Sequence, residues 1–208
     1  MAASENIRGV IFVMIGPGGA GKNAIMKALM TRFPSIRQLA TATTRPKRAS
    51  EKQGREHLFV CEQEFKRMIG AGELLEHQEV TPGKFYGIPK AAVHESLAVG
   101  GIRIADIEVL GARELAAAFP KDVVQVFVTA PGSSQGEQLD LLRRRMQERA
   151  DPLTDIDQRL ERARKLELPY QSQCDYIVVN DELTEAIEAA AAIIRRELAA
   201  RQLPLDRA

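Results

Sequence analysis

The sequence predicts an α/β fold with a three-layer architecture, a parallel β-sheet between two layers of helices. The apolar segment Val10–Ile15 has the composition of a buried strand and leads directly into a glycine-rich loop. Further apolar, β-branched segments occur at 102–106, 123–128 and 176–179, and helical patterns separate them. Strands that alternate with helices indicate a parallel sheet, because each helical crossover returns the chain to the same end of the sheet.

The first half of the chain contains both long and short elements. A helix is predicted from Lys22 to about Phe33, and a short strand from Leu39 to Thr44. Residues 49–56 are polar and predict a loop. The elements expected after this loop are strands at His57–Val60, Leu74–Leu75, Glu79–Val80 and Phe85–Ile88, and a helix over Glu62–Ala71.

The regular alternation resumes at residue 90. Helices are predicted at 90–98, 110–118, 139–149, 156–168 and 183–198, the last of them amphipathic. We therefore expect a core formed by 8–44 and 90–200, interrupted by a small mixed β insert over 45–89. The tail, 201–208, is expected to be flexible.

Composition limits the classes of function. The 208 residues are 45% hydrophobic and 27% charged, as in soluble globular proteins. The formal net charge of +1 and the aromatic content of 5% favour neither a nucleic-acid partner nor a membrane surface.

No apolar run has the length of a transmembrane helix, and the N-terminal residues lack the pattern of a secretion signal. Cys61 and Cys174 are too far apart in sequence to indicate a disulfide framework or a zinc site. We expect a cytoplasmic monomer or homodimer.

The loop after the first strand is the strongest functional signal. Its glycines let successive backbone N–H groups turn toward an anion, and the following helix adds the partial positive charge of its N-terminus. Lys22 adds a full charge for terminal phosphates. A plain glycine turn would need neither the lysine nor so many glycines. The predicted phosphate-binding residues are Gly16, Pro17, Gly18, Gly19, Ala20, Gly21, Lys22, Asn23 and Ala24.

Residues for a second, phosphorylated substrate are found in the insert and just before it. Arg45 and Arg48 follow a strand, and their guanidinium groups suit a phosphate held in one orientation; a solvated basic turn is the alternative. Glu76 follows two leucines and could accept two hydrogen bonds from a purine, or it could be exposed on a strand edge. Tyr86 could donate its hydroxyl to a phosphate, or it could belong to the core.

Taken in order, these segments closely resemble the guanylate kinase family of P-loop nucleoside monophosphate (NMP) kinases, from about Val10 to Leu198. The resemblance implies a P-loop NMP-kinase core, an inserted acceptor-binding (GMP-binding) subdomain over 45–89 and a helical lid over 145–160. The motifs that carry it, besides the loop, are Thr43-Thr44-Arg45-Pro46-Lys47-Arg48, Gly54 to Val60, Glu73-Leu74-Leu75-Glu76, Phe85-Tyr86-Gly87, Asp106-Ile107-Glu108, the arginines from Arg145 to Arg159, and Val179-Asn180-Asp181.

The family's reaction would be transfer of the γ-phosphoryl group of ATP to GMP or dGMP in purine nucleotide metabolism, with Mg²⁺ accompanying ATP. The resemblance implies that ATP binds the loop together with Arg149, Asn180 and Asp181. It implies that GMP binds Thr41, Arg45, Arg48, Glu51, His57, Glu76, Tyr86 and Asp106. The implied catalytic residues are Lys22, Arg45, Arg145, Arg149 and Arg159, and Asn23 and Glu108 would hold the metal through water.

Five positions depart from the family pattern, and two of the changes are conservative: Phe85 replaces a tyrosine, and Glu108 replaces an aspartate. Asn23 replaces a hydroxyl residue that would contact Mg²⁺, although its amide oxygen can accept a hydrogen bond from a metal-bound water. His57 replaces a tyrosine, and a partly protonated imidazole there would make acceptor binding pH-sensitive. Ile88 replaces a small hydroxyl residue that faces the guanine 6-oxo group, and a lost donor costs about 1–3 kcal/mol unless another group replaces it.

Two other functions are compatible with this fold. One is a kinase of the same fold that acts on ribose 1,5-bisphosphate, and the other is a guanylate-kinase-like binding module without catalysis. Glu76 and the Tyr86-Gly87 pair favour a purine acceptor over a sugar. The glycine loop and Lys22 favour an enzyme over a binding module.

Overall fold

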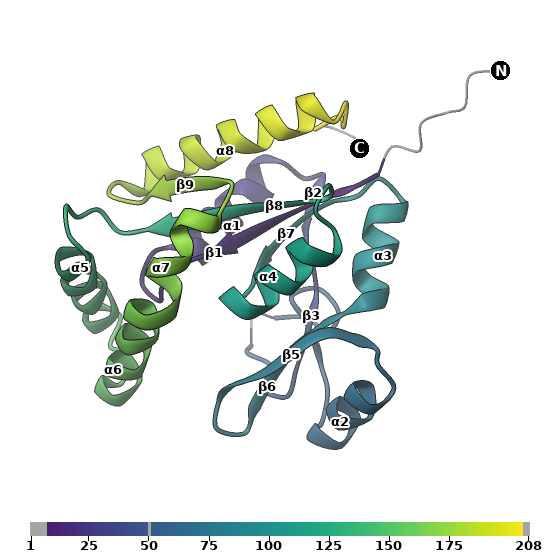
Figure 1. The fold of residues 1–208 in the computed structure, drawn as a ribbon, viewed down its shortest axis with the longest axis horizontal. Coiled ribbons are helices and arrows are strands. Elements are labelled where there is room, and N and C mark those ends of the chain that lie inside the picture. Colours follow the sequence, from purple (N-terminus) through teal and green to yellow (C-terminus); the bar gives the residue numbers. More distant parts are fainter. Residues whose placement is uncertain (1–7, 50, 206–208) are drawn as a thin grey trace.

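The computed structural model describes residues 8–49 and 51–205 and confirms the α/β prediction (Figure 1). Its main sheet has five parallel strands in the order β2-β7-β1-β8-β9. All six residues of β1 are buried, so the apolar run near the start of the chain forms the central strand. The strands are β1 (Val10–Ile15), β2 (Ile36–Gln38), β7 (Ile102–Asp106), β8 (Val123–Thr129) and β9 (Tyr176–Val179).

Helices cover both faces of this sheet (Figure 1). On one face, Phe12 and Met14 share a buried cluster with residues of α1 (Lys22–Arg32) and α8 (Leu183–Ala200). On the other face, Ile11 and Val13 share a cluster with residues of α3 (Lys90–Ala98) and α4 (Val109–Ala118). Alternate side chains of one strand thus contribute to two cores, which explains why β1 is apolar at every position.

A second, mixed sheet of four strands stands below α3 and α4 in Figure 1. Its order is β4-β3-β6-β5, with β3 parallel to β4 and antiparallel to β6. A separate small cluster that includes Ala42, Phe65 and Met68 forms its core. The elements are β3 (Thr41–Thr43), β4 (His57–Phe59), β5 (Leu74–Thr81), β6 (Lys84–Pro89) and α2 (Glu62–Gly70).

The structure differs from the sequence prediction where the two sheets join. The single strand expected over 39–44 is replaced by two strands, β2 in the main sheet and β3 in the small sheet. Leu39 is buried in the main core and its N–H donates to the carbonyl of Ile104 (2.9 Å), and the chain changes sheets directly after it. The small sheet therefore begins near residue 41 instead of 45. The two short strands expected over 74–80 are one strand, β5, with register shifts.

The segment expected to form a lid, 145–160, lies in α5 (Gln135–Glu148) and α6 (Leu153–Arg162), which we call the lid helices. A π-helical turn at Ala163–Glu167 and the short α7 (Leu168–Tyr170) follow them. The expected helix over 156–168 is thus interrupted. Helix α5 begins four residues before the predicted start, because the Ser134 hydroxyl accepts from the Glu137 N–H (3.3 Å) and caps the helix. None of the helices within 8–49 and 51–205 has both the length and the apolar character needed to cross a membrane.

Part of the tail that we expected to be flexible packs on the core through Leu203. Leu203 is 5% exposed and belongs to the same buried cluster as Phe33 and Leu198. Its N–H donates to the Leu198 carbonyl at 2.9 Å. The polar sequence around this leucine concealed its burial. The rest of the predicted tail, 206–208, lies outside the described residues.

We expect Leu203→Ala to lower the free energy of unfolding by about 2–4 kcal/mol, because it removes a buried side chain and leaves a cavity. The same substitution at Leu153, which is 67% exposed, serves as the control and should change it by less than about 0.5 kcal/mol. Urea denaturation measures both values. Equal effects would contradict the burial of Leu203.

Candidate active site

The phosphate loop, Gly16–Asn23, lies against neighbouring backbone so closely that two positions exclude a side chain. A Cβ atom on Gly16 would lie 2.0 Å from the Val128 carbonyl oxygen, and one on Gly21 would lie 2.2 Å from Asn180 Nδ2. Both glycines also have positive φ, 136° and 95°. Glycine at these positions therefore allows the loop to contact β8 and the end of β9, with the N-terminus of α1 beginning at Lys22.

Lys22 folds back over this loop. Its Nζ donates to the carbonyl oxygens of Gly16 (2.5 Å) and Pro17 (3.3 Å). It also lies 3.8 Å from Asp106 Oδ1 at the carboxyl end of β7. The structure thus brings Asp106, which we expected among the GMP-binding residues, next to the lysine of the loop.

Asn180 also supports the loop. Its side chain is 6% exposed, and its Nδ2 donates to the Ala20 carbonyl at 2.8 Å. The following residue, Asp181, accepts from Arg145 Nη2 through its backbone carbonyl at 3.4 Å. Two residues expected near adenine thus connect β9 to the loop and to the lid.

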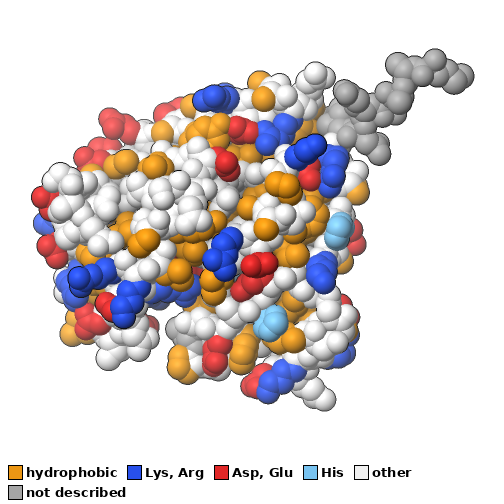
Figure 2. Space-filling view, viewed as in Figure 1, with side chains coloured by type: hydrophobic (Ala, Val, Ile, Leu, Met, Phe, Trp, Pro, Cys, Tyr) orange, Lys and Arg blue, Asp and Glu red, His pale blue; other side chains and the backbone are white. Residues whose placement is uncertain are grey.

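The lid packs directly on the phosphate loop. A Cβ atom on Gly19 would lie 3.2 Å from the Leu142 carbonyl oxygen of α5, and one on Gly18 would lie 3.3 Å from Arg159 Cδ of α6. Leu142 is fully buried at this contact. Of the predicted lid arginines, Arg159 therefore lies beside the loop. Figure 2 shows Lys and Arg side chains gathered over the lid helices, next to a notch that separates them from the small sheet.

Arg45, Glu51 and Tyr86 form a connected group in the small domain. Arg45 donates to both oxygens of Glu51 (2.8 and 2.5 Å) and, through Nε, to the Tyr86 hydroxyl (3.1 Å). Glu51 also accepts from the Arg48 backbone N–H at 2.8 Å, whereas the Arg48 side chain is exposed. The ion pair with Arg45 lowers the pKa of Glu51 to about 2. Glu51 therefore orients the first arginine and anchors the backbone of the second.

The surroundings of His57 disfavour its protonation. Its Nδ1 lies 2.7 Å from the Thr41 hydroxyl, so these two predicted acceptor residues are in contact. Burial lowers the pKa of His57, and the nearby positive charge of Arg45 lowers it further. Both effects disfavour the protonated imidazole, against the partial protonation expected from the sequence.

Glu76 lies at the boundary between the small sheet and α4. A Cβ atom on Gly111, in the first turns of α4, would lie 2.8 Å from Glu76 Oε2 and 3.2 Å from Ile88 Cδ1. Burial raises the pKa of Glu76 to about 7, with further increases from the charges of Glu114 and Glu108 and a smaller opposing effect of Arg162. Glu76 is therefore a half-buried carboxylate beside the fully buried Ile88.

Sequence analysis missed Arg162 and Glu167, which meet Glu108 between lid and core. Arg162 Nη2 lies 2.6 Å from Glu108 Oε2, and its Nε lies 3.7 Å from Glu167 Oε1. Glu167 is 6% exposed, and burial raises its pKa to about 7. In the described part of the chain, Arg162 Nε and Glu167 Oε2 are buried without a hydrogen-bond partner. The π turn, whose hydrogen bonds span five residues, brings these side chains together; a helical pattern in sequence does not reveal it.

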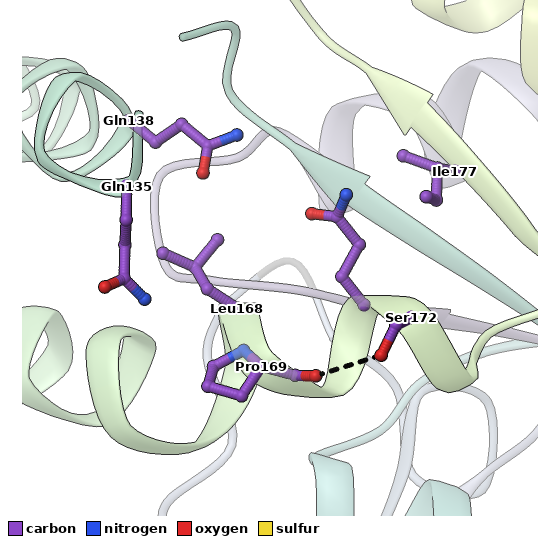
Figure 3. Close-up of a pocket in the computed structure, with 7 residues that line it drawn as sticks. Gln135, Gln138, Leu168, Pro169, Ser172 and Ile177 are labelled. Carbon is purple, nitrogen blue, oxygen red and sulfur yellow. Dashed lines mark hydrogen bonds between the residues drawn. The ribbon is translucent and has the colours of Figure 1, made fainter. Parts of the chain in front are cut away.

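A separate hollow of about 360 Å³ lies behind the lid, between α5 and α7 (Figure 3). The amides of Gln135 and Gln138 line it, and they already donate to the carbonyls of Arg164 (3.3 Å) and Ala130 (3.2 Å). None of the predicted site residues lines this hollow.

A lysine-bearing phosphate loop at the ends of parallel strands, with an inserted sheet and arginine-rich helices beside it, is typical of P-loop phosphotransferases. The comparison with known proteins is more specific. The family model "Guanylate kinase" matches residues 8–197, and the chain belongs to the guanylate kinase family.

Individual relatives agree with this assignment. The guanylate kinase of Symbiobacterium thermophilum is 38% identical over 193 residues, which cover 92% of this chain and 87% of the relative. The guanylate kinase of Maricaulis maris is 37% identical, covering 91% and 84%. Among solved structures, the guanylate kinase of Anaplasma phagocytophilum superposes with a TM-score of 0.70 at 29% identity, covering 91% of this chain and 86% of that one.

We expect the stability of the protein to depend on pH through Glu76. Its folded-state pKa of about 7 lies above the ordinary value of about 4.3, so the protonated form favours folding. This stabilisation is fully present below about pH 4.3 and is lost as pH rises through about 7. The stability of Glu76→Gln relative to the parent protein should therefore increase as pH rises from 5 to 8.

Chemical denaturation at several pH values measures this difference. Glu62→Gln, at an exposed glutamate that pairs with Lys66, is the control and should give a difference independent of pH in this range. A flat profile for Glu76→Gln would contradict the burial of the carboxylate.

Proposed function

We propose that this chain transfers the γ-phosphoryl group of ATP to GMP or dGMP, giving ADP and GDP or dGDP. The observation that carries the proposal is the presence of two built anion sites, one at the phosphate loop and one at Arg45, Glu51 and Tyr86. A kinase that acts on a nucleoside monophosphate needs one such site for the donor and one for the acceptor. The enzyme would act in the cytoplasm, as a monomer or homodimer.

The donor site would hold the phosphates of ATP. The loop N–H groups and the N-terminus of α1 suit phosphate oxygens, and Lys22 would exchange its contacts with loop carbonyls for the terminal phosphates. The support of Asn180 keeps the loop in place. Rigid donors aimed at the phosphates reduce the reorganisation needed during transfer.

The acceptor site would hold GMP by its phosphate and its base. Arg45 and Tyr86 would bind the phosphate, with Arg48 joining from the loop. Glu76 would accept hydrogen bonds from the ring N–H and the amine of guanine, which favour its ionised form. Thr41 and His57, which contact each other, would complete the site beside Arg45.

Transfer then needs little acid–base chemistry from the protein. An anionic oxygen of the GMP phosphate forms the new bond to the γ-phosphorus, and the bond to the bridging oxygen breaks, leaving its electron pair on ADP. Lys22, Arg45 and the lid arginines Arg145, Arg149 and Arg159 would stabilise the charge on the transferred group. Closure of the lid would exclude water and so prevent hydrolysis.

The side chains near the loop fit a hydrated Mg²⁺ that arrives with ATP. Within 8–49 and 51–205, His, Cys, Asp and Glu side chains form no group of three or more that could hold a metal by itself. Mg²⁺ commonly keeps several waters and binds substrate phosphates, and the oxygens of Asn23 and Glu108 suit those waters. When bound, Mg²⁺ would neutralise charge on the β- and γ-phosphates.

A substrate panel tests the proposal. With Mg-ATP as donor, we expect turnover of GMP and dGMP to exceed that of AMP, UMP and ribose 1,5-bisphosphate by at least about 100-fold in kcat/KM. A coupled assay for ADP measures it. Fastest turnover of ribose 1,5-bisphosphate would replace the proposal with a sugar-phosphate kinase, and GMP binding without turnover would indicate a binding module.

Lys22→Ala should abolish turnover and leave the affinity for GMP within about threefold, because Lys22 contacts the donor loop. Lys27→Ala, at an exposed lysine of the same helix, is the matched control and should retain full activity. Calorimetric titration with GMP gives the affinities. A parallel loss of GMP binding in Lys22→Ala would show that the donor and acceptor sites are assigned incorrectly.

Asn23→Ser should lower the Mg²⁺ concentration needed for half-maximal rate by about three- to tenfold, because a hydroxyl can contact the metal directly. Asn23→Ala, which removes the amide oxygen, should raise that concentration. Initial rates at fixed ATP and varied Mg²⁺ provide the measurement. If all three proteins respond alike, position 23 does not act on the metal.

A further inference from the structure

Three charged side chains meet where the two lid helices join. Arg149 Nη2 donates to Asp151 Oδ2 at 2.7 Å, and Arg159 Nη1 donates to the same oxygen at 3.0 Å. Arg149 follows the last residue of α5, and Arg159 lies within α6. One carboxylate oxygen thus holds together two guanidinium groups that come from different helices.

The backbone fixes the position of this carboxylate. Ala150 has a φ of 57°, in the left-handed region, at a cost of about 1 kcal/mol for a residue with a Cβ atom. Its N–H donates to the Gln147 carbonyl (2.8 Å), and the Asp151 N–H donates to the Met146 carbonyl (3.1 Å). Met146 is fully buried. The left-handed residue and the two hydrogen bonds therefore hold Asp151 in a defined place at the end of α5.

The group formed by Arg149, Asp151 and Arg159 stands over the phosphate loop. A Cβ atom on Gly18 of the loop would lie 3.3 Å from Arg159 Cδ. The Asp151 side chain is 22% exposed, whereas those of Arg149 and Arg159 are 53% and 48% exposed. The carboxylate is thus the inner member of the group, and both arginines remain open to a ligand.

The physical effect of Asp151 is on geometry more than on stability. Exposed ion pairs contribute little to folding, about 0–1 kcal/mol each. Two guanidinium groups that converge on one point repel each other, and each would lose side-chain entropy when it is immobilised. A carboxylate between them offsets the repulsion and restricts both side chains. Each guanidinium donates one N–H to Asp151 and keeps its remaining donors for a phosphate oxygen.

We propose that Asp151 is a positioning residue, which holds Arg149 and Arg159 in a convergent arrangement suited to the transferred phosphoryl group. The inference rests on the proposed function, because it assigns a purpose to the lid arginines of that reaction. Asp151 itself touches no nucleotide. By holding the two arginines before the nucleotide arrives, it reduces the ordering that transfer requires, and its effect falls on kcat.

Another role for the same contacts gives the opposite result. If Asp151 only occupied the place of a phosphate and had to be displaced, its removal would free the arginines. Asp151→Asn would then bind ATP more tightly or turn over faster than the parent protein. Either result would overturn the positioning role.

Steady-state kinetics distinguish the positioning role of Asp151 from a role in which it only occupies the place of a phosphate. We expect Asp151→Asn to lower kcat by about tenfold with KM for GMP within twofold, and Asp151→Glu to recover at least half of the lost activity. The matched control is Asp157→Asn: Asp157 also links α5 to α6, through Arg143 Nη1 at 2.8 Å, but it is 66% exposed. It should behave like the parent protein. Equal kcat values for Asp151→Asn and Asp157→Asn would overturn the proposal.

A second measurement does not depend on activity. In nucleotide-free protein, side-chain ¹⁵N NMR should show slow rotation of the Arg149 and Arg159 guanidinium groups, which becomes fast in Asp151→Asn and stays slow in Asp157→Asn. Unchanged rotation in Asp151→Asn would overturn the positioning role whatever the activity. Absence of GMP turnover in the parent protein would instead count against the proposed function, so the two failures are distinguishable.

Discussion

The close approach of the phosphate loop to the ends of β8 and β9 is the constraint on which the site depends. The loop passes so near the Val128 carbonyl and the Asn180 amide that a Cβ atom on Gly16 or Gly21 would overlap them. This contact fixes where α1 begins, and therefore where Lys22 and the helix N-terminus point. The lid packs on the other side of the same loop through Leu142 and Arg159. A displaced loop would misplace the donor site and the lid together.

Neighbouring carboxylates balance the positive charges of the site in the nucleotide-free protein. The net charge of the chain is only +1, so the cations at the site are local features. Each of four predicted phosphate-binding cations has a carboxylate neighbour: Lys22 has Asp106, Arg45 has Glu51, and Arg149 and Arg159 share Asp151. These carboxylates keep like charges close together in the free protein. Because each cation retains other N–H donors, the same arrangement can accept a nucleotide.

The carboxylates between the acceptor side and the lid are in a different environment. Glu167 is buried and Glu76 is half-buried, and burial raises the pKa of each to about 7. Arg162 pairs with Glu108 and lies 3.7 Å from Glu167, and its positive charge favours the ionised form of both Glu76 and Glu167. The π turn begins directly after Arg162 and ends at Glu167, so it sets how these two side chains meet. Irregular helical turns of this kind occur frequently at functional sites.

The sequence by itself determined the layered α/β fold, the central strand, the phosphate loop and the family motifs, because these depend on short-range patterns of apolar residues, glycines and charges. The tertiary structure alone decided the contacts between distant segments. It divided 36–43 between two sheets, buried Leu203 and lowered the pKa of His57, because these outcomes depend on neighbours far along the chain. It also brought Asp151 to two arginines and Arg162 to Glu108 and Glu167. The spacing of residues in sequence cannot reveal a π turn or an alanine in the left-handed conformation, because the surrounding packing sets both.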